Sequence, residues 1–248
     1  LLLKLINLRT FDAYNFSLTI ISSGGFLSVN NFDNLFITDL SKIILSTTML
    51  FSYFSLFFTY NLFFIKKRNI NYLSEDFYLL IYLFVIIAFI FVFFNIDNNF
   101  LNILVSITSS VSNLGISFND TPKNLSFIFL ILVIIGGSFF STSSGLRVIK
   151  VLSLIKFSLN NLLSHSKPNQ IYLNKVSLTN SNTINTDVNK YFLSIIIFVI
   201  SLFTITLLLS ISGINFENAF KIGILAIMNT VNSSMYGVDE FEFFSLSI

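Results

Sequence analysis

The stretch FDAYNFSLTIISSGGF, residues 11–26, is a short half-apolar segment that opens with Phe and runs straight into a cluster of small polar residues. The same pattern occurs in FLNILVSITSSVSNLG, residues 100–115, and in FENAFKIGILAIMNTVN, residues 216–232. In each copy about a dozen residues, or three turns of helix, separate the Phe from the polar cluster. Irregular backbone at membrane depth survives only where it is buried in protein or lines a wet cavity. In an otherwise apolar chain, the repeated pattern therefore predicts an ion pathway.

The composition predicts a polytopic membrane protein. Of the 248 residues, 54% are hydrophobic, 32 are Phe and only 10% are charged, whereas about a quarter of the residues of a soluble protein are charged. Several apolar runs reach the ~20 residues needed to cross ~30 Å of hydrocarbon. Cysteine is absent, which excludes a disulfide framework and a thiolate metal site.

Long apolar segments and half-spans alternate along the chain. The predicted half-spans are residues 11–21, 100–111 and 216–228. The predicted long segments are residues 43–65, 77–94, 124–159 with an interruption in the middle, and 191–211. A polar stretch from Ser164 to Lys190 reads as a surface connection.

The spacing of the copies indicates a true internal repeat. The opening residues Phe11, Phe100 and Phe216 are 89 and 116 residues apart. The excess in the second interval is about the length of the polar connection, so the units are nearly equal without it. Internal symmetry of this kind is common in channels and transporters built around a central pathway.

Basic and acidic residues fall on opposite sides of this topology. We predict that the basic side is cytoplasmic, because Lys and Arg near span ends favour that side. Nine of the 14 basic residues lie there: Lys66, Lys67, Arg68, Arg147, Lys150, Lys156, Lys167, Lys175 and Lys190. Nine of the 12 acids lie opposite: Asp12, Asp33, Asp39, Asp97, Asp120, Glu217, Asp239, Glu240 and Glu242. All three half-spans enter from the acidic side, where negative charge concentrates cations.

The polar clusters that follow the half-spans are the candidate ion-binding residues. A dehydrated monovalent cation needs several oxygen ligands of moderate field strength, and backbone carbonyls provide them. Aiming successive carbonyls at one axis requires non-helical backbone, which Gly permits and Ser, Thr and Asn tolerate. The predicted filter residues are Ser22, Ser23 and Gly24, then Asn113, Leu114 and Gly115, then Thr230, Val231 and Asn232.

A second candidate site interrupts the long segment at GGSFFSTSSGLRVIK, residues 136–150. Backbone groups freed there must face protein or water. The polar members are Gly136, Gly137, Ser138, Ser141, Thr142, Ser143, Ser144 and Gly145. The alternative is a Gly/Ser kink packed against a neighbouring helix. We expect Lys150 to be a membrane-surface anchor, while Arg147 either anchors or contacts this segment.

The two sets of motifs resemble the Trk-type potassium uptake proteins of the Trk/Ktr/HKT superfamily. The resemblance rests on residues 11–28 and, more specifically, on residues 136–150, and it extends over essentially the whole chain. It divides the chain into a second repeat (residues 1–65), a third repeat (66–163), a cytoplasmic connector (164–190) and a fourth repeat (191–248). The family's first repeat and last helix are missing, so we take the sequence to be a piece of a longer protein.

The resemblance implies an all-α fold of helix, pore loop and helix units around a pseudo-fourfold ion pathway. It assigns filter roles to the nine residues above and a gating role to the loop from Gly136 to Gly145. It further implies a homodimer in the bacterial inner membrane with a cytoplasmic nucleotide-binding regulatory partner. The sequence departs from the family in its third filter, which is usually richer in Thr, and at Asn232, where the family has Gly. Both departures bear on selectivity more than on the fold.

Potassium transport is the preferred function, with no cofactor besides the transported ion. The alternatives are a sodium-conducting member of the same superfamily, a respiratory-chain membrane subunit, and a structural membrane protein. A proton-pumping subunit needs ionisable groups inside its spans, and residues 77–94 and 191–211 contain no charged residue. We expect no enzyme, no metal site at the single histidine, His165, and no nucleic-acid binding, because the required residue patterns are missing.

Overall fold

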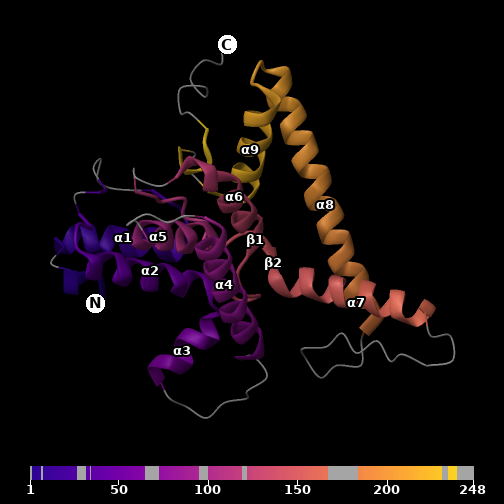
Figure 1. Ribbon diagram of the computed structural model, residues 1–248, viewed down its shortest axis with the longest axis horizontal. Helices are drawn as coiled ribbons and strands as arrows, with labels where there is room; N and C mark the ends of the chain where they lie inside the picture. Colours follow the sequence, from indigo (N-terminus) through magenta and orange to yellow (C-terminus); the bar gives the residue numbers. More distant parts are fainter. Residues whose placement is uncertain are drawn as a thin grey trace.

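The structure is a computed structural model that describes residues 2–6, 8–26, 32–33, 35–64, 73–94, 100–118, 122–166, 184–230 and 234–238. Helices dominate it (Figure 1), which confirms the all-α class. The first half contains η1 (Leu2–Ile6), α1 (Thr10–Ser22), α2 (Asp39–Tyr53), α3 (Leu56–Phe64), α4 (Leu73–Phe93) and α5 (Phe100–Val111). The second half contains η3 (Lys123–Leu125), α6 (Ser126–Ile134), β1 (Ile135–Gly136), β2 (Leu146–Arg147), α7 (Val148–Ser166), α8 (Ile184–Ile211), α9 (Phe216–Ile227) and η4 (Ser234–Tyr236).

Three short helices occupy the predicted half-spans. The helices α1, α5 and α9 have 13, 12 and 12 residues, and their ends differ from the predicted ones by no more than one residue. At ~1.5 Å per residue each is about 18–20 Å long, too short to cross a bilayer. The last carbonyls of each helix therefore need partners from the chain beyond the helix end.

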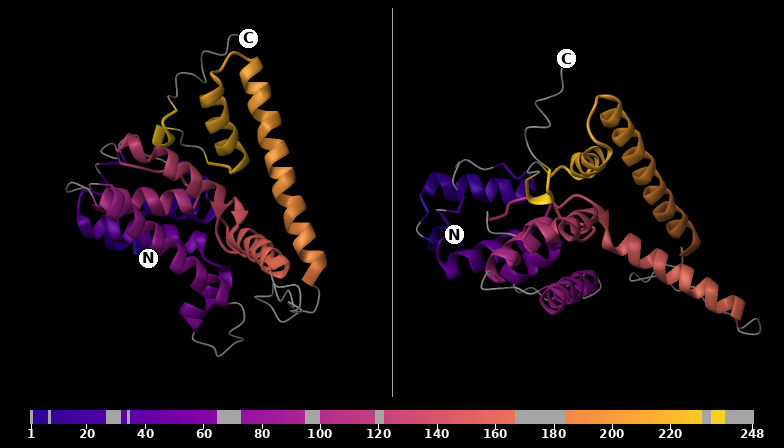
Figure 2. Two further views of the ribbon diagram at one scale, coloured as in Figure 1. Left: turned by 45° about the vertical axis from the view of Figure 1, so that its right-hand side comes forward. Right: turned by 45° about the horizontal axis from the view of Figure 1, so that its top comes forward.

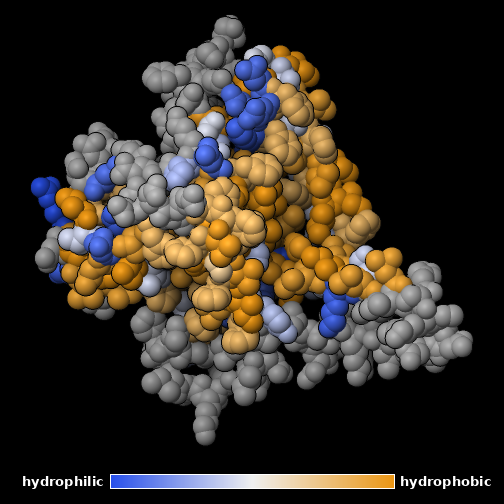
Figure 3. Space-filling model, viewed as in Figure 1, coloured by the Kyte–Doolittle hydropathy of each residue, from blue (hydrophilic) through white to orange (hydrophobic). Residues whose placement is uncertain are grey.

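Two helices of the described chain are long and apolar enough to cross a membrane. They cover Glu75–Phe93 in α4 and Val188–Ile211 in α8. Within these windows only 22% of α4 and 11% of α8 is buried, and hydrophobic side chains cover much of the visible surface (Figure 3). Exposed apolar faces of this length suit a hydrocarbon surrounding and make this a membrane protein.

The expectation of one long helix over residues 43–65 is wrong. The structure divides it into α2 and α3, with Phe54 in extended backbone at ψ 162°. The helix does not continue because the Ser55 N–H is donated to the Asp76 carboxylate instead of to a helical carbonyl. Hydropathy counts apolar residues and cannot register a hydrogen-bond acceptor that comes from another helix.

The polar connection is shorter than residues 164–190. The helix α7 continues to Ser166 and α8 already begins at Ile184, so both ends of the expected connector are helical. The remainder, residues 167–183, lies outside the described residues, as do residues 66–68 and five of the nine acids expected on the acidic side. These acids are Asp97, Asp120, Asp239, Glu240 and Glu242.

The helix α5 is central to the packing. Its residues Ile107 and Val111 belong to an apolar cluster with α4, α6 and α9, whereas Val105 belongs to a second cluster with α1 and α2. Its buried face includes Ser106, Ser109 and Ser110, whose small side chains let neighbouring helices approach closely. The helix α5 thus connects the first short helix to the third.

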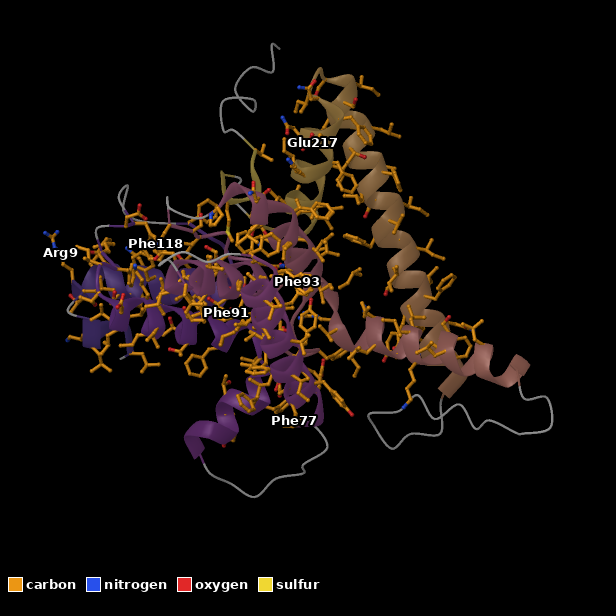
Figure 4. The ribbon with its side chains drawn as sticks, in the orientation of Figure 1. Arg9, Phe77, Phe91, Phe93, Phe118 and Glu217 are labelled. Carbon is orange, nitrogen blue, oxygen red and sulfur yellow. The ribbon has the colours of Figure 1, made fainter. Side chains whose placement is uncertain are left out.

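The helices α8 and α9 form a hairpin that lies beside this bundle in all views (Figures 1 and 2). The turn between them contains Gly213 at φ +99°, a left-handed conformation that glycine adopts without strain. The two helices approach closely at Gly223, where an added Cβ would lie 3.1 Å from Cγ2 of Thr206. Figure 4 places Glu217 at the turn end of α9, where its carboxylate forms a 2.7 Å salt bridge with Lys221.

We predict that Gly223→Leu destabilises the hairpin while Gly223→Ala is tolerated. A Leu side chain would overlap Thr206 and Leu202, and overpacking of this kind costs about 1–3 kcal/mol. The measurement is the unfolding temperature of the purified full-length protein in detergent. Ala226→Leu, at an exposed position of α9, is the control, and an equal response of Gly223→Leu and this control would contradict the close approach.

Candidate ion-binding site and intramembrane loop

The three short helices end in the same backbone motif. Each is followed by a non-glycine residue in left-handed conformation: Ser23 at φ 50°, Asn113 at φ 61° and Asn229 at φ 55°. A left-handed conformation at such residues costs on the order of 1 kcal/mol. Finding it at all three ends indicates that the surrounding structure imposes it.

Two hydrogen bonds define this motif at every end. After α1, the Ser23 N–H is donated to the Ile20 carbonyl and the Gly24 N–H to the Thr19 carbonyl, both at 3.2 Å. After α5, the Asn113 N–H is donated to the Ser110 carbonyl at 3.1 Å and the Leu114 N–H to the Ser109 carbonyl at 2.9 Å. After α9, the Asn229 N–H is donated to the Ala226 carbonyl at 3.3 Å and the Thr230 N–H to the Leu225 carbonyl at 2.9 Å. This is the Schellman arrangement, and it makes Ser23, Asn113 and Asn229 equivalent positions.

This equivalence changes the register of the predicted filter residues. The predicted triplets begin one residue before the left-handed residue at Ser22, on it at Asn113, and one residue after it at Thr230. Ser22 is the last residue of α1. Composition suggested the triplets, whereas the hydrogen bonds that close each helix set the backbone register. Val231 and Asn232 lie outside the described residues.

Two residues beyond the left-handed position, the first two ends carry glycine. Gly25 has φ 69° and Gly115 has φ 72°. The residue after each glycine is tied back to its helix by a hydroxyl: Thr19 Oγ1 donates to the Phe26 carbonyl at 2.8 Å, and Ser109 Oγ accepts the Ile116 N–H at 2.6 Å. The third end has Leu225 at the position of these hydroxyl residues, so it cannot form the same tie.

The end of α5 contacts the end of α9, and it shares an apolar cluster with α1. Asn113 Nδ2 donates to the Met228 carbonyl at 3.4 Å, across 115 residues of sequence. Leu114, fully buried, shares one apolar cluster with Phe16 and Ile20 of α1. Asn113 therefore links the polar clusters that follow α5 and α9.

The interruption after α6 is a loop and not a kink. Strands β1 and β2 pair in parallel, with Ile135 opposite Leu146 and Gly136 opposite Arg147, so the chain returns to its starting point between them. An added Cβ at Gly136 would collide with the Ser144 carbonyl, and one at Gly137 with the Tyr53 carbonyl. Both glycines are required because other backbone approaches them closely.

The loop docks on the break between α2 and α3. Ser138 N–H is donated to the Tyr53 carbonyl and Ser143 N–H to the Ser52 carbonyl, each at 3.1 Å. In return the Leu56 N–H is donated to the Phe140 carbonyl at 3.2 Å. The carbonyls and the N–H freed where α2 ends therefore find their hydrogen-bond partners in the loop. The backbone groups of the loop find theirs in the break between α2 and α3.

Arg147 holds the inside of the loop together. Its Nη1 donates to the Ser138 carbonyl and the Ser141 hydroxyl at 2.7 Å each, and to the Ser143 carbonyl at 2.9 Å. Of the two roles left open by the sequence, the structure selects contact with the loop. Thr142, Ser144 and Gly145 form the remaining part of the predicted loop. Thr142 Oγ1 donates to the Ser52 carbonyl at 3.3 Å, and Gly145 adopts a φ of 103°.

Two acids of α4 fasten this assembly, and the sequence analysis did not identify them. Asp76, fully buried, accepts the Ser55 N–H at 2.9 Å and the Ser55 hydroxyl at 2.5 Å. Glu75 accepts the Phe139 N–H at 2.8 Å. Their position just before an apolar run is typical of an ordinary helix start. The available signal was their position in the sequence. This pair of acids follows Lys66, Lys67 and Arg68, which the charge distribution assigns to the basic side.

Among the described residues, no group of three or more His, Cys, Asp or Glu is placed to hold a metal ion. The oxygens gathered at the helix ends are carbonyls, hydroxyls and an amide. Neutral oxygens of this kind suit a weakly held monovalent cation better than a tightly held divalent one.

Comparison with known proteins shows a shared fold. No protein-family model matches the sequence, and a search of curated proteins finds no significant match. Among solved structures, the chain is similar to the crystal structure of the potassium transporter TrkH from Vibrio parahaemolyticus, with a TM-score of 0.76 and 19% sequence identity. The match covers 92% of this chain and 51% of the TrkH chain, so the chain spans about half of the length of that transporter.

We predict that Arg147→Gln loosens the loop. The substitution removes the charge that binds four loop oxygens, and hydrogen bonds to a charged group contribute about 1.5–3 kcal/mol each. The measurement uses the absence of native cysteine: a cysteine placed at buried Ser138 is modified by a water-soluble thiol reagent, and we expect about tenfold faster modification. Lys150→Gln, which removes a neighbouring charge, is the control; equal rates in both variants would contradict the role of Arg147.

Proposed function

We propose that this chain forms part of a Trk-type membrane protein that conducts potassium ions. The observation that carries the proposal is the set of three short helices with identical caps, of which the second contacts the third through Asn113 and Met228. A fold shared with a potassium transporter supports it. Each cap lies at the negative end of a helix dipole, which favours a cation there.

In the proposed mechanism the segments beyond the caps form the selectivity filter. Their carbonyl oxygens replace part of the hydration shell of the ion, and the left-handed residues turn successive carbonyls away from helical direction. The filter is built from the predicted triplets, which are aligned with one another on the left-handed residues Ser23, Asn113 and Asn229. Gly25 takes the place equivalent to Gly115.

The proposed gate is the loop from Gly136 to Gly145. Its docking on Ser52 and Tyr53 makes it part of the wall formed by two neighbouring units. Movement of the loop breaks its hydrogen bonds to Ser52, Tyr53 and Glu75, so opening exchanges these partners for water while the Arg147 contacts inside the loop persist. A loop held by a few polar contacts is suited to be displaced at modest free-energy cost.

The finer expectations extend the same proposal. The chain corresponds to the second repeat from its pore helix, the third repeat, and the fourth repeat through its filter. It works as a multi-pass protein of the bacterial inner membrane, as a homodimer, with a cytoplasmic nucleotide-binding regulatory subunit. It is not an enzyme and uses no cofactor, because potassium is its cargo.

Sodium conduction by the same architecture is the alternative, and it is favoured by the departures at the third and fourth filters. A respiratory-chain subunit has less support, since the buried Asp76 is occupied by the backbone and side chain of Ser55. Such a carboxylate stabilises a helix break and is not available to relay protons.

We predict that Gly115→Asp and Gly24→Asp in the full-length protein lower potassium uptake at least about tenfold, because a carboxylate within the filter holds the ion too tightly or blocks it. The measurement is potassium-dependent growth and uptake in a bacterium that lacks its own uptake systems. Gly213→Asp is the matched control, since Gly213 also has positive φ but has no atom within 4 Å of an added Cβ. Unchanged uptake by a Gly115→Asp variant that inserts normally would argue against this filter.

We predict that deletion of residues 139–142 raises potassium leak, because the shortened loop no longer reaches both Ser52 and Tyr53. The measurement is potassium efflux from proteoliposomes that contain the full-length protein. Adding Gly115→Asp to the deletion is the control and should abolish the leak. A deletion variant that leaks no more than the wild type would rule out a gating role for the loop.

A further inference from the structure

The helix α7 carries an exposed apolar stripe along one face. Its members follow one another at intervals of three or four residues, which places them on the same side of a helix. They are Leu152, Ile155, Leu159 and Leu162, and their side chains are 40%, 51%, 53% and 65% exposed. A contiguous apolar surface of this kind marks a site where a protein contacts a membrane or another protein.

The other half of α7 carries its basic residues. Lys150, Ser153 and Lys156 recur at intervals of three residues and lie away from the stripe. Lys156 is exposed and Lys150 is half-buried. Although α7 has 19 residues, it is not one of the two described helices that are apolar enough to cross a membrane. A long helix with an apolar stripe and lysines on its other side is typical of helices that lie in the surface of a bilayer.

The position of α7 in the fold agrees with a place at the bilayer surface. The helix contacts α8 and runs across the lower end of α8 rather than alongside it (Figure 1). The membrane-crossing part of α8 begins at Val188, just after the helix starts at Ile184. Because α7 meets α8 near that end, it lies at the level where hydrocarbon gives way to lipid headgroups. In Figure 3 hydrophobic residues cover the side of α7 that faces the middle of α8, and a hydrophilic group lies on the side away from it.

Two further observations identify lipid as the partner of this helix. The stripe continues the exposed apolar surface of α8, whose membrane-crossing window is only 11% buried and faces hydrocarbon. The lysines Lys150 and Lys156 supply positive charge at the same end of α8. Anionic phospholipids attract basic residues that lie at the bilayer surface, so the charge of α7 complements their headgroups while its stripe complements their acyl chains.

We propose that α7 is an interfacial helix that binds anionic phospholipids. Its apolar stripe lies at the boundary between headgroups and acyl chains, about 5–10 Å deep, while Lys150 and Lys156 extend to the lipid phosphates. Because α7 begins at Val148, directly after Arg147, the bound lipid also fixes the outgoing end of the loop that follows β1. The inference goes beyond the proposed function, since it does not depend on which ion the protein conducts.

The depth of α7 is measured with introduced tryptophans, because the 248 residues contain none. The positions in Leu152→Trp and Leu159→Trp are two turns, or ~10 Å, apart along the helix axis. Val199→Trp, at a 40% exposed position within the α8 span, is the control. Each full-length variant is reconstituted in vesicles of phosphatidylcholine and phosphatidylglycerol, with the unsubstituted protein as the blank. Phosphatidylcholine brominated near the headgroup or near the chain ends then quenches tryptophans at the matching depth.

We expect Leu152→Trp and Leu159→Trp to be quenched to the same extent, and more strongly by the shallow bromines than by the deep ones. Val199→Trp should show the reverse. Depths that differ by about 10 Å between the two α7 positions would mean that α7 crosses the bilayer. Absence of quenching at both would mean that protein, such as a second copy of the chain, covers the stripe. Either result would overturn the proposal. If one variant does not assemble, Ile155→Trp on the same stripe replaces it.

The contact with anionic headgroups has its own test. In mixed vesicles, brominated phosphatidylglycerol should quench Leu159→Trp better than brominated phosphatidylcholine does. Adding Lys156→Gln should lower this preference about fivefold, the factor that one lysine near an anionic surface contributes, whereas Lys156→Arg should retain it. Arg9→Gln is the control, because Figure 4 places Arg9 at the end of the molecule far from α7. An unchanged preference in the Lys156→Gln variant would overturn the binding of anionic lipid by α7.

Discussion

Inside a bilayer a backbone N–H or carbonyl must find its partner within the protein, because each unmet group costs several kcal/mol in hydrocarbon. This chain ends several helices at buried positions, and the rest of the structure follows from how the freed backbone groups at each end are satisfied. At the ends of α1, α5 and α9 the chain closes its own last carbonyls with local hydrogen bonds. At the end of α2 the freed groups are satisfied by the loop between β1 and β2.

The break between α2 and α3 and the loop after β1 are complementary parts of one assembly. Neither is stable alone, since the loop N–H groups of Ser138 and Ser143 need the carbonyls of Tyr53 and Ser52. Arg147 organises the loop from inside, while Glu75 and Asp76 fasten the loop and the break to the start of α4. A displacement of the loop therefore disturbs α2, α3 and α4 together.

Much of this arrangement was predictable because it is encoded locally. The short helices follow from a Phe-opened apolar run and a polar stop, and the loop follows from glycines in an apolar segment. The staggered register of the triplets was not predictable from composition, since the position of the left-handed residue depends on which N–H closes the last turn. The α2–α3 break was missed because Ser55 stands in an apolar run and its partner, Asp76, resembles an ordinary residue at a helix start.

The sequence by itself determined that the chain belongs in a membrane, that three short helices recur, and that a polar loop interrupts the segment after α6. These properties depend on hydropathy and on hydrogen bonds within a few residues. Only the tertiary structure decided where α2 ends, what Arg147 holds, and that Asn113 meets Met228. The partners in those contacts include groups far apart in sequence, and a freed carbonyl or a buried charge carries no local mark of the group that will satisfy it.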